Sequence, residues 1–421
     1  MGMHRFNRYG RSLLGLTAAG LIAGACFSDE NNEVLGPTRV GGNDGIFASY
    51  VALGNSITAG YQSSGITDAT QRQSYAFLLA QQMNTRYAYA SLAGRGCNPP
   101  VANFQTQAGA GTITAAQRPT ICDLRNPATT DILTNVAVPN ASSYDPMDED
   151  GTSFSNTLTS LILGGATQVQ MALAAKPTFA SIWIGNNDVL GFAVGNGTTA
   201  GLAGMTPVAT FQTNYTGMLD AMVAGAPGLR GVLIGVVQVA NAPIMFPAAA
   251  LSNPTFKAGF DAIANATTVL DPSCVAGGAG ATSLINTFLA FQIRQGAHPA
   301  VIACVAGGAT GALTAPIGDI LVLDPTEQAT VAARVNAYNA HIEAEAARIG
   351  FGYYDPNSTL VTLRTAGTVV ANVPTWGPTG TFGTGMSLDG VHPGAPVHRL
   401  IANELIAVIN AEYGTTLSPV P

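Results

Sequence analysis

Apolar, β-branched runs alternate with segments of helical periodicity along most of this 421-residue chain. The candidate strands are residues 47–53, 87–92, 179–184, 232–239 and 351–354. The candidate helices are residues 72–84, 156–175, 207–224, 327–349 and 396–412. Strands that are apolar along their whole length and separated by helices are typical of a parallel sheet covered on both faces. The chain is therefore predicted to be an α/β protein with a flavodoxin-like, doubly wound sheet of about five parallel strands.

Two long stretches, residues 93–134 and 241–325, interrupt this alternation. Both are rich in Gly, Ala, Pro and Thr and lack clear periodicity, so we expect elaborated loops on one domain that covers residues 46–415. The second stretch is large enough to form a small lid or subdomain.

Each insertion contains two cysteines, namely Cys97 and Cys122 in the first, and Cys274 and Cys304 in the second. Four cysteines allow three pairings, and the sequence does not choose among them. Pairing within each insertion would close one long loop and would suit an oxidising compartment. No two of these cysteines have the short spacing of a metal site, and we predict neither a metal nor another cofactor.

The first 25 residues have the layout of a secretory signal peptide. Arg5, Arg8 and Arg11 precede a short apolar stretch that ends in small residues, and this stretch is too short to span a bilayer. Cys26 follows directly in a context that resembles a lipoprotein box, so we predict lipidation of Cys26, with secretion without a lipid as the alternative. Residues 26–45 then form a flexible tether. The expected location is the outer membrane or cell surface, or otherwise the periplasm or the medium.

Charge excludes one broad class of partner. Only 10% of the residues are charged, and the formal net charge is −7. Without a basic patch the chain is a poor candidate for nucleic-acid binding. We expect a monomer that acts on a small molecule or a lipid and touches a membrane only through its N-terminal lipid.

Ser56 lies where the first candidate strand runs into a turn, within Gly54-Asn55-Ser56-Ile57. Such a junction holds a hydroxyl at the open edge of a sheet, where a distant segment can bring a base to it. The alternative is a turn serine that caps the next helix.

Of the histidines after the predicted signal peptide, His392 has the context of a catalytic base. It follows Asp389 by three residues, with Gly390 between them, and a tight turn can present the carboxylate to one ring nitrogen. His341 and His398 fall within helical segments and are expected to be solvated, and His298 is expected to be a loop residue.

Donors for an oxyanion are expected at the ends of neighbouring strands. The third candidate strand leads into Gly185-Asn186-Asn187-Asp188, which brings the Asn187 amide to the same sheet edge as Ser56. The segment 135–142 offers a backbone N–H at Asn140, and Gly94 is a competing candidate.

Together these segments resemble the SGNH hydrolases, the GDSL-type esterases and lipases. Ser56 matches the nucleophile of the first family block, Asn187 the asparagine of the third, and Asp389 and His392 the pair of the fifth. Asn140 stands at the glycine of the second block, where the family uses a backbone N–H, and Asn55 replaces the usual Asp before the nucleophile. The resemblance covers most of residues 46–412, without the insertions.

The resemblance implies hydrolysis of a carboxylic ester through an acyl-enzyme. Ser56 would attack, His392 would take its proton, Asp389 would orient the imidazole, and the N–H groups of Ser56 and Asn140 with the Asn187 amide would bind the oxyanion. The ester could belong to a lipid, a short-chain acyl compound or an acetylated sugar. Two alternatives stay open, namely a non-catalytic surface lipoprotein that binds glycan or lipid, and an acyltransferase.

Overall fold

The computed structural model describes residues 45–92, 94–123, 132–148, 157–194, 204–305, 322–370 and 382–421. The predicted signal peptide at 1–25, Cys26 and nearly all of the predicted tether at 26–45 lie outside these residues, and they stay predictions.

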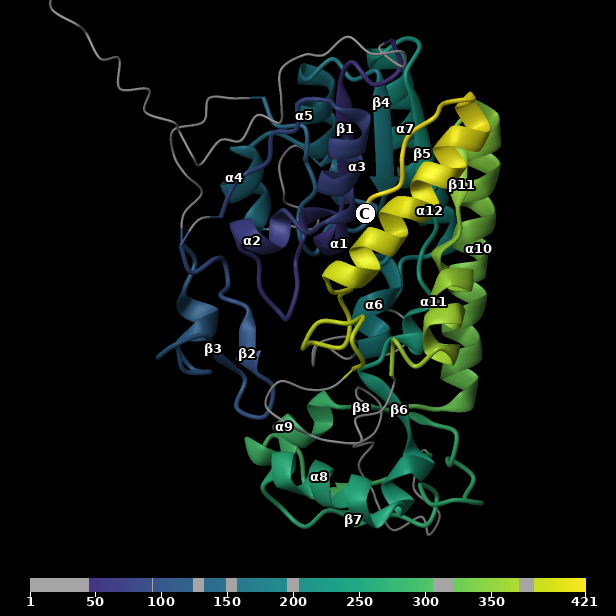
Figure 1. The fold of residues 1–421 in the computed structure, drawn as a ribbon. Helices are drawn as coiled ribbons and strands as arrows, with labels where there is room; N and C mark the ends of the chain where they lie inside the picture. The colour runs from purple at the N-terminus through teal and green to yellow at the C-terminus, as the bar shows by residue number, and fades with distance from the viewer. Residues whose placement is uncertain are drawn as a thin grey trace, which may run out of the picture. The chain divides into compact units, whose positions relative to one another are not determined.

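Four parallel strands form the central sheet, in the order β1-β4-β5-β11 (Figure 1). They span Tyr50–Gly54 (β1), Phe179–Trp183 (β4), Arg230–Ile234 (β5) and Gly352–Tyr354 (β11). All residues of β1 and β4 are buried, which accounts for their uninterrupted apolar runs. The predicted α/β class with a parallel sheet is confirmed.

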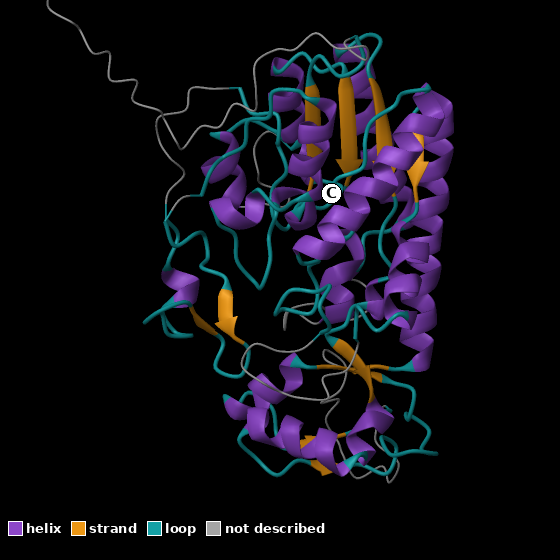
Figure 2. Cartoon of the chain, viewed as in Figure 1, coloured by secondary structure: helices purple, strands orange, loops and turns teal. Residues whose placement is uncertain are grey.

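Helices cover both faces of this sheet (Figure 2). Alternate side chains of β1 point to opposite faces, so that Val51 and Leu53 enter one hydrophobic core and Tyr50 and Ala52 enter the other. The helices of the first core are α5 (Gln168–Ala174), α7 (Val208–Gly225) and α10 (Pro325–Ile349). Those of the second are α3 (Tyr75–Met83) and α12 (Ala395–Tyr413).

The expected strand at 87–92 is wrong. The neighbour of β1 on its free edge is the irregular segment 134–138, in which Val136 N–H donates to Ala52 O at 2.9 Å and Val138 N–H to Gly54 O at 3.1 Å. The backbone of residue 88 bonds to that segment and not to β1, because its carbonyl accepts the N–H of Thr134 at 2.8 Å. Tyr87 stacks on the ring of Tyr50. The alternating tyrosines that suggested a strand therefore serve packing.

The predicted helix at 156–175 is interrupted. It consists of α4 (Thr157–Leu163) and α5, because Gly164 and Gly165 both adopt positive φ between them. The other helices near the sheet are α1 (Ser56–Ala59), α2 (Asp68–Gln71), α6 (Asn187–Val194) and α11 (Pro356–Thr365).

The second insertion, where elaborated loops or a small lid or subdomain were expected, supplies most of a separate hydrophobic core, to which Phe104 and Phe382 also belong. Its elements are β6 (Met245–Pro247), α8 (Pro254–Ala264), β7 (Val269–Leu270), β8 (Leu284–Asn286), α9 (Phe288–Arg294) and β9 (Val301–Ile302), and β10 (Val322–Leu323) joins β8 and β6 in an antiparallel sheet. Phe246, Phe260 and Ile285 are fully or almost fully buried in this core, as is the Cys274–Cys304 disulfide. Its strands are too short to give a pattern, whereas Phe256, Phe260 and Ile263 of α8 do have the spacing of one helix face, which the sequence reasoning missed.

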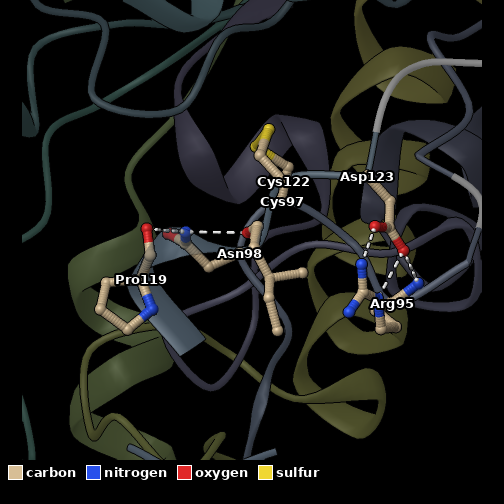
Figure 3. Close-up of a disulfide and its surroundings, with 7 residues drawn as sticks. Arg95, Cys97, Asn98, Pro119, Cys122 and Asp123 are labelled. Carbon is tan, nitrogen blue, oxygen red and sulfur yellow. Dashed lines mark hydrogen bonds and ion pairs between the residues drawn. A yellow bond between two sulfur atoms is a disulfide. The ribbon is translucent and has the colours of Figure 1, made fainter. Parts of the chain in front are cut away.

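The first insertion is closed by the Cys97–Cys122 disulfide. Figure 3 shows what surrounds it: Arg95 forms an ion pair with Asp123 at 2.8 Å, and the Asn98 side chain donates to Pro119 O at 3.0 Å. Its strands are β2 (Val101–Asn103) and β3 (Ala108–Gly109). Both disulfides thus lie within their own insertion, and they are typical of proteins exported to an oxidising compartment. None of the helices within the described ranges is long and apolar enough to span a membrane.

His398 differs from its prediction, because it is fully buried and not solvated. It lies on α12, and its Nδ1 accepts the N–H of Tyr75 at 3.2 Å. Burial, together with the nearby His392, lowers the pKa of His398 to about 3. The imidazole therefore stays neutral in the folded protein at a pH where an exposed histidine is charged.

This difference predicts a stability that falls as the pH falls. Between about pH 6.5 and pH 3 the unfolded chain binds a proton at His398 and the folded chain does not, so acid favours unfolding. At pH 5 the contribution is about 2 kcal/mol. Urea unfolding at pH 7 and pH 5 should show that His398→Gln loses less stability on acidification than the wild type, by roughly this amount. An equal loss in both proteins would contradict the burial of a neutral imidazole.

Candidate active site

Ser56 is the first residue of α1, directly beyond the carboxyl end of β1. Asn55 caps this helix, and its side-chain oxygen accepts the N–H of Ile57 at 3.1 Å. Gly54 allows the sharp turn, since a Cβ there would lie 2.1 Å from Thr58 Oγ1. The Asn in place of the family's Asp thus keeps the acceptor that the turn uses.

His392 and Asp389 meet Ser56 in one chain of hydrogen bonds. His392 Nε2 lies 2.8 Å from Ser56 Oγ, and His392 Nδ1 lies 2.8 Å from Asp389 Oδ2. An ionised carboxylate only accepts, so Nδ1 carries the proton and Nε2 is free to accept the Ser56 hydroxyl. The structure therefore brings together the three residues that the sequence singled out.

Asp389 is almost completely buried and remains ionised. Burial alone would raise its pKa, but the His392 imidazole and the hydrogen bonds to the carboxylate hold the pKa well below its usual range. Its donors besides the His392 ring are the Ser387 hydroxyl and the backbone N–H groups of Ser64, Val391 and His392, at 2.7–2.9 Å.

A tight turn from the other end of the sequence holds this acid in place. Ser63 and Ser64 both have φ of 54°, and Gln62 and Gly65 exchange backbone hydrogen bonds around them, as in a type I′ turn. Ser63 N–H donates to Ser387 Oγ at 2.9 Å, while Ser63 Oγ accepts the N–H of residue 388 at 3.0 Å. Serine in this left-handed region costs about 1 kcal/mol per residue, which the contacts to residues 387–389 offset.

One aromatic side chain, Tyr61, and one basic side chain, Arg118, complete the surroundings of the triad. The ring of Tyr61 packs against the imidazole of His392, with 4.9 Å between ring centroids. Burial raises the pKa of Tyr61 to about 12, so its hydroxyl is neutral. Arg118 reaches in from the first insertion and donates to Ser64 O at 3.1 Å. The disulfide-closed loop therefore supports the serine turn.

Asn187 begins α6, at the carboxyl end of the neighbouring strand β4. Its Nδ2 donates to Ala141 O at 2.8 Å, which leaves its second amide hydrogen free for another acceptor. Gly185 precedes it with φ of 123°, and a Cβ there would lie 2.5 Å from Val236. Only glycine permits this approach of the turn to β5.

The loop that carries Asn140 is tied to both strands. Val138 bonds to Gly54 of β1, Ala141 bonds to Asn187, and both the N–H and the hydroxyl of Ser143 donate to Asp188 at 2.9 and 2.6 Å. Asn140 has φ of 67°, the conformation that Asn tolerates better than most residues. Its N–H and that of Ser56 have no hydrogen-bond partner among the described residues.

Gly94, the competing candidate, lies in the disulfide-closed region beside Asp123. No described contact ties it to Ser56. The loop tied to Gly54 and Asn187 is therefore the better source of the second backbone donor.

Sequence reasoning missed the groups that orient the site. Asp188 fixes the Asn140 loop, and burial raises its pKa to about 6. The sequence did contain a signal for this role, because Asp188 directly follows Asn187 and an acid in a buried turn needs hydrogen-bond donors. The role of Ser63 and Ser64 had no signal, since Asn-Gly and not Ser-Ser is the usual sequence of such a turn.

Among the described residues no three His, Cys, Asp or Glu side chains are arranged to hold a metal ion.

Comparison with known proteins identifies the family of the chain. The model of the family "GDSL-like Lipase/Acylhydrolase" matches residues 50–405, and the chain belongs to this family. No curated protein matches it. Among solved structures it is similar to an extracellular lipase from Streptomyces rimosus, with 13% identity, a TM-score of 0.32, and coverage of 86% of this chain and 98% of that one. A candidate GDSL-like lipase from Parabacteroides merdae gives 11% identity, a TM-score of 0.30, and coverage of 85% and 94%.

The serine turn predicts a cost for removing Ser387. Ser387→Ala deletes the donor to Asp389 and leaves the partly buried Ser63 N–H without an acceptor, which should lower the free energy of unfolding by about 1–3 kcal/mol. Urea unfolding measures this difference. Ser358→Ala, an exposed position on α11, is the control and should change stability by less than about 0.5 kcal/mol. Equal values for the two variants would contradict the stabilising role of the turn.

Proposed function

We propose that this protein hydrolyses carboxylic esters through an acyl-enzyme on Ser56. The observation that carries the proposal is the uninterrupted chain of 2.8 Å hydrogen bonds from Ser56 through His392 to Asp389. The family membership supports the same reaction class. The geometry of a serine, a histidine and an acid in this order is what activates a hydroxyl as a nucleophile.

In the first half-reaction Ser56 Oγ attacks the ester carbonyl while His392 Nε2 takes its proton. The charge on the carbonyl oxygen is met by the N–H groups of Ser56 and Asn140 and by the free amide hydrogen of Asn187. His392 then returns the proton to the leaving alcohol, and the acyl group remains on Ser56. In the second half-reaction water loses a proton to His392 and attacks the acyl-enzyme, which releases the acid and restores the serine.

Asp389 acts through His392 and does not touch the substrate. Its charge stabilises the imidazolium that forms in both half-reactions, and its position fixes the tautomer that leaves Nε2 free. The low pKa of Asp389 keeps it ionised at neutral pH and in mild acid, so it offers this support there.

Substitution of the nucleophile tests the proposal. Ser56→Ala should abolish hydrolysis of p-nitrophenyl acetate and butyrate and should prevent labelling by a fluorophosphonate, because only an activated serine reacts. Thermal unfolding of the variant controls for folding. Wild-type protein that takes no label and cleaves no ester would favour the non-catalytic binding protein instead, and transfer to alcohols in preference to water would favour an acyltransferase.

The oxyanion donors can be separated by two variants. Asn140→Gly should keep its activity, because the reaction uses only the backbone N–H and Gly adopts positive φ readily. Asn187→Ala removes a side-chain donor and should lower kcat about 100- to 1000-fold. Steady-state kinetics on p-nitrophenyl butyrate measures both. A large loss in Asn140→Gly would show that the side chain takes part in the reaction.

A further inference from the structure

An apolar cavity extends from the candidate active site along the carboxyl edge of the sheet. The space that water-sized centres can occupy in it is about 90 Å³, and the cavity is partly open to solvent. Its lining follows the strand ends in order: Asn55 and Ser56 after β1, Trp183 at the end of β4, Val237 after β5 and Tyr354 at the end of β11. Side chains of α11 and α12 contribute to the wall of this path.

The polarity of the cavity changes from one end to the other. Ser56, His392 and three asparagines lie at the β1 and β4 end. At the β11 end the polar lining residues are Tyr354 and Thr359, whose hydroxyl groups bond each other at 2.8 Å. The lining includes no Asp, Glu, Lys or Arg side chain. A ligand that fits this cavity has a polar group at one end and an apolar chain along the rest.

The strand order sets the length of this chain. The path from β1 to β11 crosses three strand spacings of about 4.8 Å, or about 14 Å in total. A carbon–carbon bond of about 1.5 Å advances an extended zigzag chain by about 1.25 Å, so a chain of roughly twelve carbons covers this distance. The β11 end is bounded by core side chains, among them Leu363 and Val369, which are 9% and 2% exposed.

Chemistry indicates which half of the ester the cavity holds. The leaving alcohol must depart before water attacks the acyl-enzyme, and an apolar cavity that ends at core side chains would retain it. The acyl group stays bonded to Ser56 until the second half-reaction. A cavity bounded by the core therefore suits the acyl half, and the alcohol leaves on the solvent side.

We propose that this cavity is an acyl pocket for chains of about ten to twelve carbons and that Leu360 on α11 limits the chain length. The proposal rests on the proposed ester hydrolysis, and it selects fatty acyl esters over acetylated sugars. Leu360 lines the β11 end of the cavity, whereas Val361, its neighbour on the helix, is 56% exposed and does not line it.

A series of p-nitrophenyl esters from acetate to palmitate tests the pocket with one leaving group throughout. Each added CH₂ that enters the pocket should raise kcat/KM about fourfold until the chain reaches about ten to twelve carbons, after which kcat/KM should fall. A maximum at acetate, or a flat series, would overturn the proposal while leaving the ester hydrolysis by Ser56 intact. A chain-length preference among alkyl acetates with none among acyl chains would also overturn it, because the cavity would then hold the alcohol.

Two tryptophan variants on the same helix test Leu360. Leu360→Trp should lower the ratio of kcat/KM for decanoate to that for acetate at least tenfold and move the maximum to shorter chains. Val361→Trp should leave this ratio as in the wild type. Fluorophosphonate labelling of both variants shows whether Ser56 is still activated, so loss of the reaction is distinguished from loss of the pocket. Equal ratios in the two variants would overturn the role of Leu360.

Discussion

The candidate site depends on the contact between two side chains that are 336 residues apart in sequence, the Ser56 hydroxyl and the His392 imidazole. Parallel strands make this contact possible, because their carboxyl ends meet at one edge of the sheet. Sheet geometry alone does not orient an imidazole to within a hydrogen bond. That step requires Asp389, and Asp389 in turn requires the serine turn at 62–65, which comes only a few residues after Ser56. The nucleophile and the anchor of its base therefore belong to one local segment.

The same principle applies to the proposed oxyanion donors. The loop at 138–143 bonds to Gly54 just before Ser56 and to Asn187 and Asp188 after β4. It continues the segment 134–138, which takes the edge position of a regular fifth strand, and its irregular backbone leaves the N–H of Asn140 without a partner among the described residues. A fully paired strand would have used its N–H groups in the sheet. The departure from regular structure is what makes a donor available.

The sequence predicted the features that rest on local pattern and missed those that rest on distant partners. Apolar runs and their polar ends located Ser56 and Asn187, because strand ends share one sheet edge whatever the details of packing. The three-residue spacing within a tight turn located Asp389 and His392. The tyrosines at 87–92 alternate as in a strand, but the competing segment at 134–138 pairs with β1. His398 occurs in an amphipathic helix, yet the N–H of Tyr75 provides a buried partner that helical periodicity does not reveal. The strands of the second insertion are too short to give a periodic signal, and the helical spacing of α8 went unrecognised in a stretch rich in Gly, Ala, Pro and Thr, although together these elements bury a core.

Electrostatics explains how an ionised acid and an apolar cavity share one small region. An unpartnered carboxylate buried in apolar surroundings would take up a proton, because burial disfavours its charge. Asp389 is surrounded by donors from three directions: the His392 ring, its own turn and the serine turn. Each of these is part of the protein, so the charge does not depend on water. The cavity beside the triad can therefore stay apolar without raising the pKa of Asp389, and its low polarity strengthens the attraction between Asp389 and a protonated His392.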